Sequence, residues 1–187
     1  VTDPFGALPA FKTDFNAVLA RAVNALRGRF DRFWSEDRPC DVRILEDDDM
    51  LPSMAYTLAN PTDAGLVKWG RCWPGFTTAG HPFGTRLEFA RPSVFFDPNN
   101  QALPEVASVA VSRQTTHPDL SDRELYDELI RQTRTLETQA QEKLRRANQR
   151  FLGEARVLRQ KWRDSPRTRE ARFTVTPTVS SKSKWAR

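Results

Sequence analysis

Apolar residues in the first part of the chain change between helix-like and strand-like spacing. Residues 9–28 carry apolar side chains three or four positions apart, which places them on one face of a helix. These side chains are Phe11, Phe15, Val18, Ala22 and Leu26. Pro9 suits the first turn of this helix and Gly28 suits its C-terminal end. Strands are predicted at 29–34 and 41–45, where apolar and aromatic residues flank a turn-forming SEDRP segment.

A second helix is predicted at about residues 48–60. Three aspartates at 47–49 offer an N-cap and acidic residues for the first turn. We expect Pro61 to end the helix, because the residue before a proline is displaced from helical backbone angles. Gly65 then permits a tight turn.

The second half of the chain predicts two strands and one long helix. The segments 85–96 and 105–112 have strand character, and a turn-rich segment separates them. The helix is expected at about 121–150, with a single apolar line along it. That line consists of Leu125, Leu129, Leu136, Ala140, Leu144 and Phe151. Because the line is thin, the helix must pack through a narrow stripe or pair with a second chain.

Together these elements predict an α+β fold. We expect a partial antiparallel sheet from strands 29–34 and 41–45, packed against the helices 9–28 and 48–60. The chain divides in this interpretation into residues 1–80, with the first two helices, and an extension over 81–187. The extension holds β segments, the long helix and a basic tail.

Composition narrows the class of protein. Hydrophobic residues make up 39% of the 187 positions, below the average of about 45–50%, so one core with polar segments beside it is expected. No apolar run reaches the roughly 18–20 residues that span a bilayer, and the N-terminus has no signal-peptide pattern. Cys40 and Cys72 lack metal-type spacing. A cytoplasmic protein with free thiols and no membrane partner is the expectation.

Positive charge is concentrated at the end of the chain. Residues 143–187 hold fourteen Lys or Arg against three Asp or Glu, so residues 1–142 carry a net charge of −6. This asymmetry favours a segment that binds a polyanion, with a solvated surface helix and loose tail as the alternative. The candidate phosphate contacts are Lys143, Arg145, Arg146, Arg150, Arg156, Arg159, Lys161 and Arg163. Trp162 and Trp185 are candidates for stacking on bases.

The most informative stretch is MAYTLANPTDAGLV at residues 54–67, with WPG following at 73–75. It resembles the signature of the REP-associated single-tyrosine transposases of the HUH endonuclease superfamily. The matching residues, in order, are Tyr56, Asn60, Pro61, Gly65, Leu66, Val67, Trp73 and Pro74. RFLGEARVLRQ at 150–160 resembles a C-terminal block of one subgroup. The resemblance covers most of residues 3–75 and parts of 150–187, and implies an incomplete HUH-type, ferredoxin-like core.

The resemblance implies a mechanism of DNA transposition and recombination. Tyr56 would attack a phosphodiester of single-stranded DNA, hairpin forms included, and form a 5′-phosphotyrosine link. In the complete family protein a divalent metal, Mg²⁺ or Mn²⁺, polarises the phosphate. Asn60 would support that metal, because positions i and i+4 share a helix face. Without the resemblance, such a tyrosine is usually a packing residue and such an asparagine a cap or turn former.

The family's His-hydrophobe-His pair, which holds the metal, has no counterpart. His81 and His117 each precede a proline in a loop-like context and follow the tyrosine, so we expect loop residues. A lone Asn carbonyl cannot hold a divalent cation at useful affinity. We therefore expect this chain to bind no metal and to be inactive in strand cleavage alone, as a C-terminal fragment or a decayed copy.

Two other hypotheses stay open. The chain can be a non-catalytic nucleic-acid-binding module that uses its basic C-terminal segment. It can also be a helical interaction protein in which residues 121–150 pair with a partner, although Gln132 and Thr133 make a poor coiled-coil seam. The sequence does not give the oligomeric state.

Overall fold

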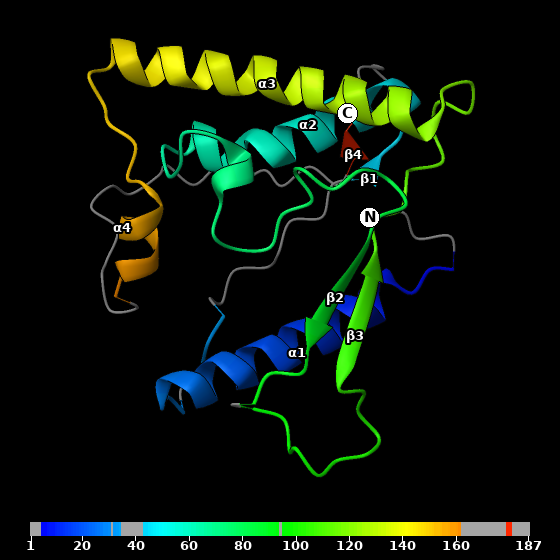
Figure 1. Ribbon diagram of the computed structural model, residues 1–187, viewed down its shortest axis with the longest axis vertical. Coiled ribbons are helices and arrows are strands. Elements are labelled where there is room, and N and C mark those ends of the chain that lie inside the picture. The colour runs from blue at the N-terminus through cyan, green and yellow to red at the C-terminus, as the bar shows by residue number, and fades with distance from the viewer. Residues whose placement is uncertain (1–4, 31, 35–42, 94, 162–178, 181–187) are drawn as a thin grey trace. The chain divides into compact units, whose positions relative to one another are not determined.

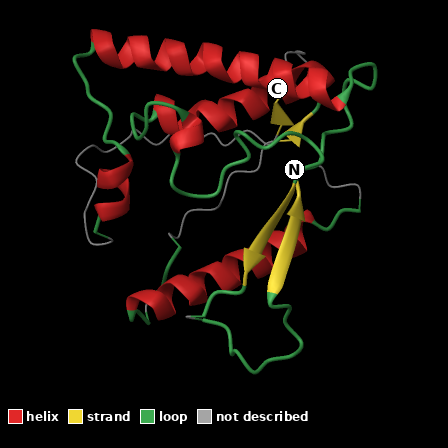
Figure 2. Ribbon diagram, viewed as in Figure 1, coloured by secondary structure: helices red, strands yellow, loops and turns green. Residues whose placement is uncertain are grey.

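The computed structural model describes residues 5–30, 32–34, 43–93, 95–161 and 179–180. Helices and strands are mixed, so the α+β prediction is confirmed at that level (Figures 1 and 2). The helical elements are α1 (Leu8–Arg27), α2 (Asp47–Asp63), the 3₁₀ turn η1 (Gly70–Cys72), α3 (Asp122–Arg146) and α4 (Glu154–Arg159). The strands are β1 (Arg43–Ile44), β2 (Arg86–Ala90), β3 (Val106–Ala110) and β4 (Val179–Ser180).

The chain forms two compact units that are each discontinuous in sequence. One unit comprises Val1–Pro39 and Arg86–Thr115, and the other comprises Cys40–Thr85 and Thr116–Arg187. The first contains α1 and the β2–β3 hairpin, and the second contains α2, α3 and α4. The functional division at residue 80 stays a prediction.

Helix α1 confirms the first helix prediction. Gly28 closes it with a φ of 61°, and the N–H of Arg29 donates to the Asn24 carbonyl at 2.9 Å, so the terminal carbonyls are satisfied. None of its residues is buried, and Phe11 and Phe15 stack on each other with ring centroids 5.7 Å apart. The predicted apolar face therefore exists as a pattern, and its side chains stay partly exposed.

The predicted antiparallel pair of strands at 29–34 and 41–45 is wrong. The described residues of 29–34 form no strand; instead the Trp34 indole donates to the Asn16 carbonyl at 3.1 Å, which ties the segment back to α1. Residues 41 and 42 lie outside the described ranges. Strand β1 pairs with β4 in parallel, as Arg43 with Val179 and Ile44 with Ser180. A strand needs a backbone partner, and here the partner comes from the far end of the chain.

The β2–β3 hairpin confirms the other two strands, which are shorter than predicted. The pairing is antiparallel, from Arg86 opposite Ala110 to Ala90 opposite Val106. Pro92 has no N–H to donate, which accounts for the early end of β2. The Arg91 guanidinium donates to three carbonyls of the connecting loop, those of Pro98, Asn100 and Leu103.

The core of the second unit lies between α2 and α3. Leu51 and Ala55 of α2 pack with Leu125 and Leu129 of α3. The two helices run in the same direction, because Asp63 near the end of α2 pairs with Lys143 near the end of α3 at 3.1 Å. Partly buried residues surround this cluster, namely Met54, Leu58, Phe83, Leu120 and Leu136. The narrow apolar stripe of the long helix thus packs on another helix of the same chain.

Helix α3 begins with a reciprocal capping box. The Ser121 hydroxyl accepts the Glu124 N–H at 3.3 Å, and the Glu124 carboxylate accepts the Ser121 N–H at 2.9 Å. These hydrogen bonds satisfy two backbone donors that no helix can pair internally.

Pro61 does not end α2, contrary to the prediction. The helix continues to Asp63, because a proline in the last turn removes only one backbone hydrogen bond near an end. Gly65, with a φ of 69°, makes the end instead. Its N–H donates to Thr62 at 2.9 Å, and the Leu66 N–H donates to Pro61 at 3.0 Å. This pair of hydrogen bonds is a Schellman motif. The helix begins after Glu46, so the three aspartates occupy the first turn rather than the N-cap.

Candidate nucleic-acid surface

Tyr56 and Asn60 share one face of α2, as their i, i+4 spacing requires. Tyr56 is 57% exposed and Asn60 is exposed as well. The residues that face α3 are the small Ala55, fully buried, and Ala59. The apolar residues that flank Tyr56 and Asn60 in the sequence predict a position at the edge of the core, out of open solvent, and that prediction is wrong. One step of 100° around the helix separates this pair from the buried alanines.

The described residues do not fit a divalent metal ion. No three His, Cys, Asp or Glu side chains in the described part of the chain lie close enough together to hold one. Asn60 is the one residue to which the resemblance assigns a role as a metal ligand. His81 lies in a loop, where its N–H donates to the Thr78 carbonyl at 3.0 Å, and His117 lies in the loop before α3. The prediction that both histidines are loop residues is confirmed.

The predicted phosphate contacts divide into two sets. Lys143 pairs with Asp63 at 3.1 Å, and both Arg145 and Arg146 bind Glu142. The hydrogen bonds from these two arginines lower the pKa of Glu142 to about 2, so its carboxylate stays ionised. The positive charge at the end of α3 is therefore partly neutralised by neighbours.

The second set follows α3 and includes three arginines without an ion pair among the described residues. Arg150, Arg156 and Arg159 have no ion-pair partner among the described residues, and all three are exposed. Lys161 is exposed at the end of the same segment. Arg163, Trp162 and Trp185 lie outside the described residues. We call Arg150, Arg156 and Arg159 the free arginines.

Two backbone hydrogen bonds join the segment that carries the free arginines to the turn at the end of α2. The Leu152 N–H donates to the Gly65 carbonyl at 2.9 Å, and the Gly153 N–H donates to the Leu66 carbonyl at 2.9 Å. A methyl of Leu144 lies 3.7 Å from the position of a Cβ built on Gly65, so this corner is closely packed. The segment before α4 is therefore held against the turn that follows Tyr56 and Asn60.

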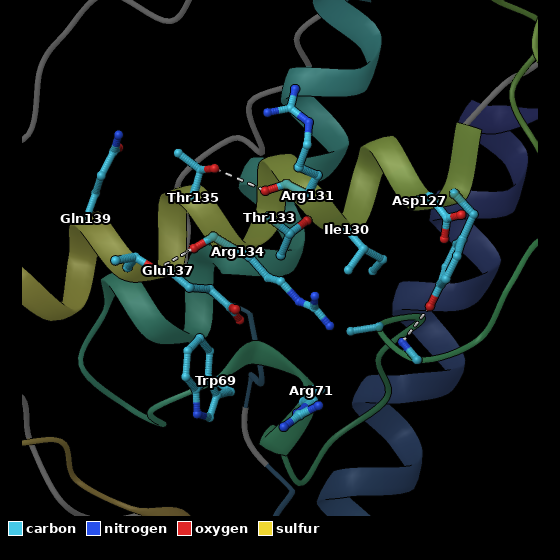
Figure 3. Close-up of a pocket in the computed structure, with 14 residues that line it drawn as sticks. Trp69, Arg71, Asp127, Ile130, Arg131, Thr133, Arg134, Thr135, Glu137 and Gln139 are labelled. Carbon is cyan, nitrogen blue, oxygen red and sulfur yellow. Dashed lines mark hydrogen bonds between the residues drawn. The ribbon is translucent and has the colours of Figure 1, made fainter. Parts of the chain in front are cut away.

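A buried carboxylate lies on the stripe of α3 that faces α2. Glu137, labelled in Figure 3, is only 5% exposed. Its Oε1 accepts the Gly70 N–H at 2.5 Å. Burial raises the pKa of Glu137, while the Gly70 hydrogen bond and the charges of Arg71 and Arg134 oppose that rise. We did not single out this residue from the sequence. The signal in the sequence was its spacing, because Glu137 follows Leu129 and Thr133 at four-residue intervals on the face of the helix that also carries Ala140.

The raised pKa of Glu137 predicts that the stability of the protein depends on pH. The folded state keeps its proton to a higher pH than the unfolded chain does, so this contribution is lost as pH rises above about 4.3 through the folded pKa. Glu137→Gln keeps the acceptor for Gly70 and carries no charge. We expect the variant to melt above the wild type at pH 7.5 and to match it at pH 4. A wild type that is equally or more stable at pH 7.5 would contradict this.

Comparison of the chain with protein-family models, curated proteins and solved structures gives no match. None of the helices in the described ranges has the length and apolar character that a membrane crossing needs.

Proposed function

We propose that the protein acts on single-stranded DNA by the chemistry of a single-tyrosine transposase, with Tyr56 as the nucleophile. Its phenol oxygen would attack a phosphodiester, forming the tyrosine–phosphate bond and releasing the 3′-oxygen of the neighbouring nucleotide. The finer assignment of an HUH-type core belongs to this proposal. Because the described residues do not fit a metal ion, no step here depends on one.

The observation that supports the proposal most is the contact between the two parts of the resemblance. The Tyr56 block includes Gly65 and Leu66, and the C-terminal block begins at residue 150. Leu152 and Gly153 bind those two residues through their backbones. Residues far apart in sequence, chosen for one resemblance, thus meet in one corner of the fold.

The arrangement suits a strand that passes from the free arginines to the tyrosine. The exposed phenol of Tyr56 and the amide of Asn60 make no side-chain hydrogen bond within the described residues, so both can contact a ligand. The free arginines supply unpaired positive charge beside the helix end. Charge-assisted contacts to phosphate of this kind bind a backbone without reading its sequence.

A second candidate, a non-catalytic module that binds nucleic acid, is favoured by the metal misfit. It needs the free arginines and does not need the Tyr56 hydroxyl. The two candidates differ only in whether a covalent link forms.

We expect the free arginines to carry strand binding, tested with a labelled single strand over a series of salt concentrations. Arg150→Gln, Arg156→Gln and Arg159→Gln together should reduce the log–log salt slope by about 2, because each phosphate contact on a single strand contributes about 0.7. The matched control replaces Lys143, Arg145 and Arg146 by glutamine.

The control should have the smaller effect, because those three side chains already pair with Asp63 and Glu142. A flat salt dependence of the wild type would contradict strand binding. Equal losses from the two triple variants would contradict the assignment to the free arginines.

A further inference from the structure

A groove of about 1020 Å³ lies between α3 and the loop that follows α2 (Figure 3). One wall consists of α3 side chains that include Tyr126, Ile130, Arg134 and Glu137, and the other contains Trp69, Arg71 and Gly80. The Tyr126 hydroxyl accepts the Gly80 N–H at 3.1 Å and closes one end. The volume suits a ligand of nucleotide size.

Two arginines line this groove from opposite walls, and neither is in an ion pair within the described part of the chain. Arg71 belongs to η1 and Arg134 to α3, both line the groove, and Figure 3 shows the Arg134 side chain extending past Glu137. Neither guanidinium has a hydrogen-bond or ion-pair partner among the described residues. Both are close enough to Glu137 to lower its pKa.

The third arginine of the groove, Arg131, is already bound. Its Nε lies 2.7 Å and its Nη2 2.5 Å from the two carboxylate oxygens of Glu128. These hydrogen bonds hold the pKa of Glu128 at about 2. Arg131 therefore has little capacity left for an anion, in contrast to Arg71 and Arg134.

The groove also has an aromatic surface beside its cations. Trp69 lines it and is partly exposed, and it immediately precedes η1, which carries Arg71. Gly70 is fixed between them by its hydrogen bond to Glu137. An indole can stack on a base, and the two guanidinium groups beside it, which have no ion pair among the described residues, can bind a phosphate joined to that base.

We propose that this groove binds a nucleoside phosphate, with its phosphate between Arg71 and Arg134 and its base on Trp69. The ligand is a nucleotide of a bound DNA strand or a free nucleotide, which share this chemistry. A nucleotide of a bound strand would give the protein a second contact with the DNA. The choice of DNA as the source of this nucleotide rests on the proposed function.

The test measures binding of a fluorescent oligodeoxyadenylate and of deoxyadenosine monophosphate to the whole chain. Arg71→Gln with Arg134→Gln should raise the dissociation constant about tenfold or more, since hydrogen bonds to charged groups are lost. The control, Arg86→Gln with Arg123→Gln, removes the same charge from side chains outside the groove, which contact Ser108 and Asp127. It should change binding by less than about twofold.

Trp69→Leu tests whether a base stacks on the indole, and an abasic strand controls for a variant that fails to fold. The substitution should weaken the oligodeoxyadenylate about fivefold or more and leave an abasic strand of the same length unchanged. If only the oligonucleotide depends on Arg71 and Arg134, the ligand is a strand; if the mononucleotide does too, the groove binds a nucleotide by itself.

The inference is overturned if the wild type binds neither probe, or if the arginine variant and its control lose equal affinity. If substitution of the free arginines abolishes binding while Arg71→Gln with Arg134→Gln leaves the dissociation constant unchanged, the groove proposal is rejected. The proposed function would not be contradicted by that result.

Discussion

Tyr56→Phe is expected to abolish the covalent protein–DNA adduct. Phenylalanine keeps the ring but lacks the oxygen that attacks phosphorus, and loss of a nucleophile lowers enzymatic rates by up to about 10⁶-fold. Since Tyr56 is 57% exposed on α2, its hydroxyl contributes little to folding, and the variant should be as stable as the wild type. The measurement is an SDS-stable band from a labelled hairpin strand and protein expressed from its whole reading frame, with Mg²⁺ or Mn²⁺.

Tyr126→Phe is the matched control, because it removes a hydroxyl from the other tyrosine of the chain. It loses one hydrogen bond, to Gly80, and should keep the adduct. Asn60→Ala should slow the reaction and leave some adduct, because it removes an exposed polar side chain one helix turn from the phenol and leaves the nucleophile in place. An adduct that survives in Tyr56→Phe and disappears in Tyr126→Phe would reverse the assignment.

Gly70→Ala is expected to disrupt the α2–α3 core. A Cβ at this position would overlap the Leu58 carbonyl oxygen and lie 3.2 Å from Oε1 of Glu137. The backbone oxygen cannot yield without moving α2, so we expect a loss of about 3 kcal/mol in the free energy of unfolding. The hydrogen bond from Gly70 to Glu137 would shift with it. Urea unfolding followed by helical circular dichroism measures the loss.

Gly84→Ala is the control for the backbone alone. Gly84 has a φ of 86° and no heavy atom within 4 Å of an added Cβ, so only conformational strain of about 1–2 kcal/mol applies. Equal stability losses in the two variants would mean that the contact at Leu58 is not what restricts residue 70.

The helices were predictable because local spacing dictates them. The apolar residues of α3 recur at three and four positions, and one face of a helix is the simplest way to bury them. Ser121 and Glu124 stand in capping-box spacing before this run, so the start of the helix was also readable. The spacing did not say what the stripe packs on, since the contact with α2 joins distant segments.

The incorrect predictions concern the C-terminal end of α2 and the strand that pairs with β1. Pro61 is a strong local signal, but Gly65 four residues later supplies the left-handed residue that ends α2. Strand β1 pairs with Val179–Ser180, and no local pattern near Arg43 indicates so distant a partner.

The candidate site was predictable only in part. The shared face of Tyr56 and Asn60 follows from helix geometry, whereas their exposure depends on Ala55 and Ala59 being the residues that face α3. The pairing of Arg145 and Arg146 with Glu142 follows i,i+3 and i,i+4 helix spacing, so the sequence carried that signal. The pair of Lys143 with Asp63 joins distant segments and could not be read from the sequence. Arg71 and Arg134 line one groove, and the hydrogen bond from Gly70 to Glu137 holds η1 against α3 there.

The most direct test of the central claim is to locate the DNA-linked residue. The adduct is trimmed with nuclease, digested with trypsin and analysed by mass spectrometry. Cleavage after Arg43 and Lys68 yields a peptide of residues 44–68 that contains Tyr56, while Tyr126 lies in residues 124–131. We predict the nucleotide mass on Tyr56 in the first peptide. A nucleotide on Tyr126, or no adduct at all from the wild-type protein, would contradict the assignment of Tyr56 as the nucleophile.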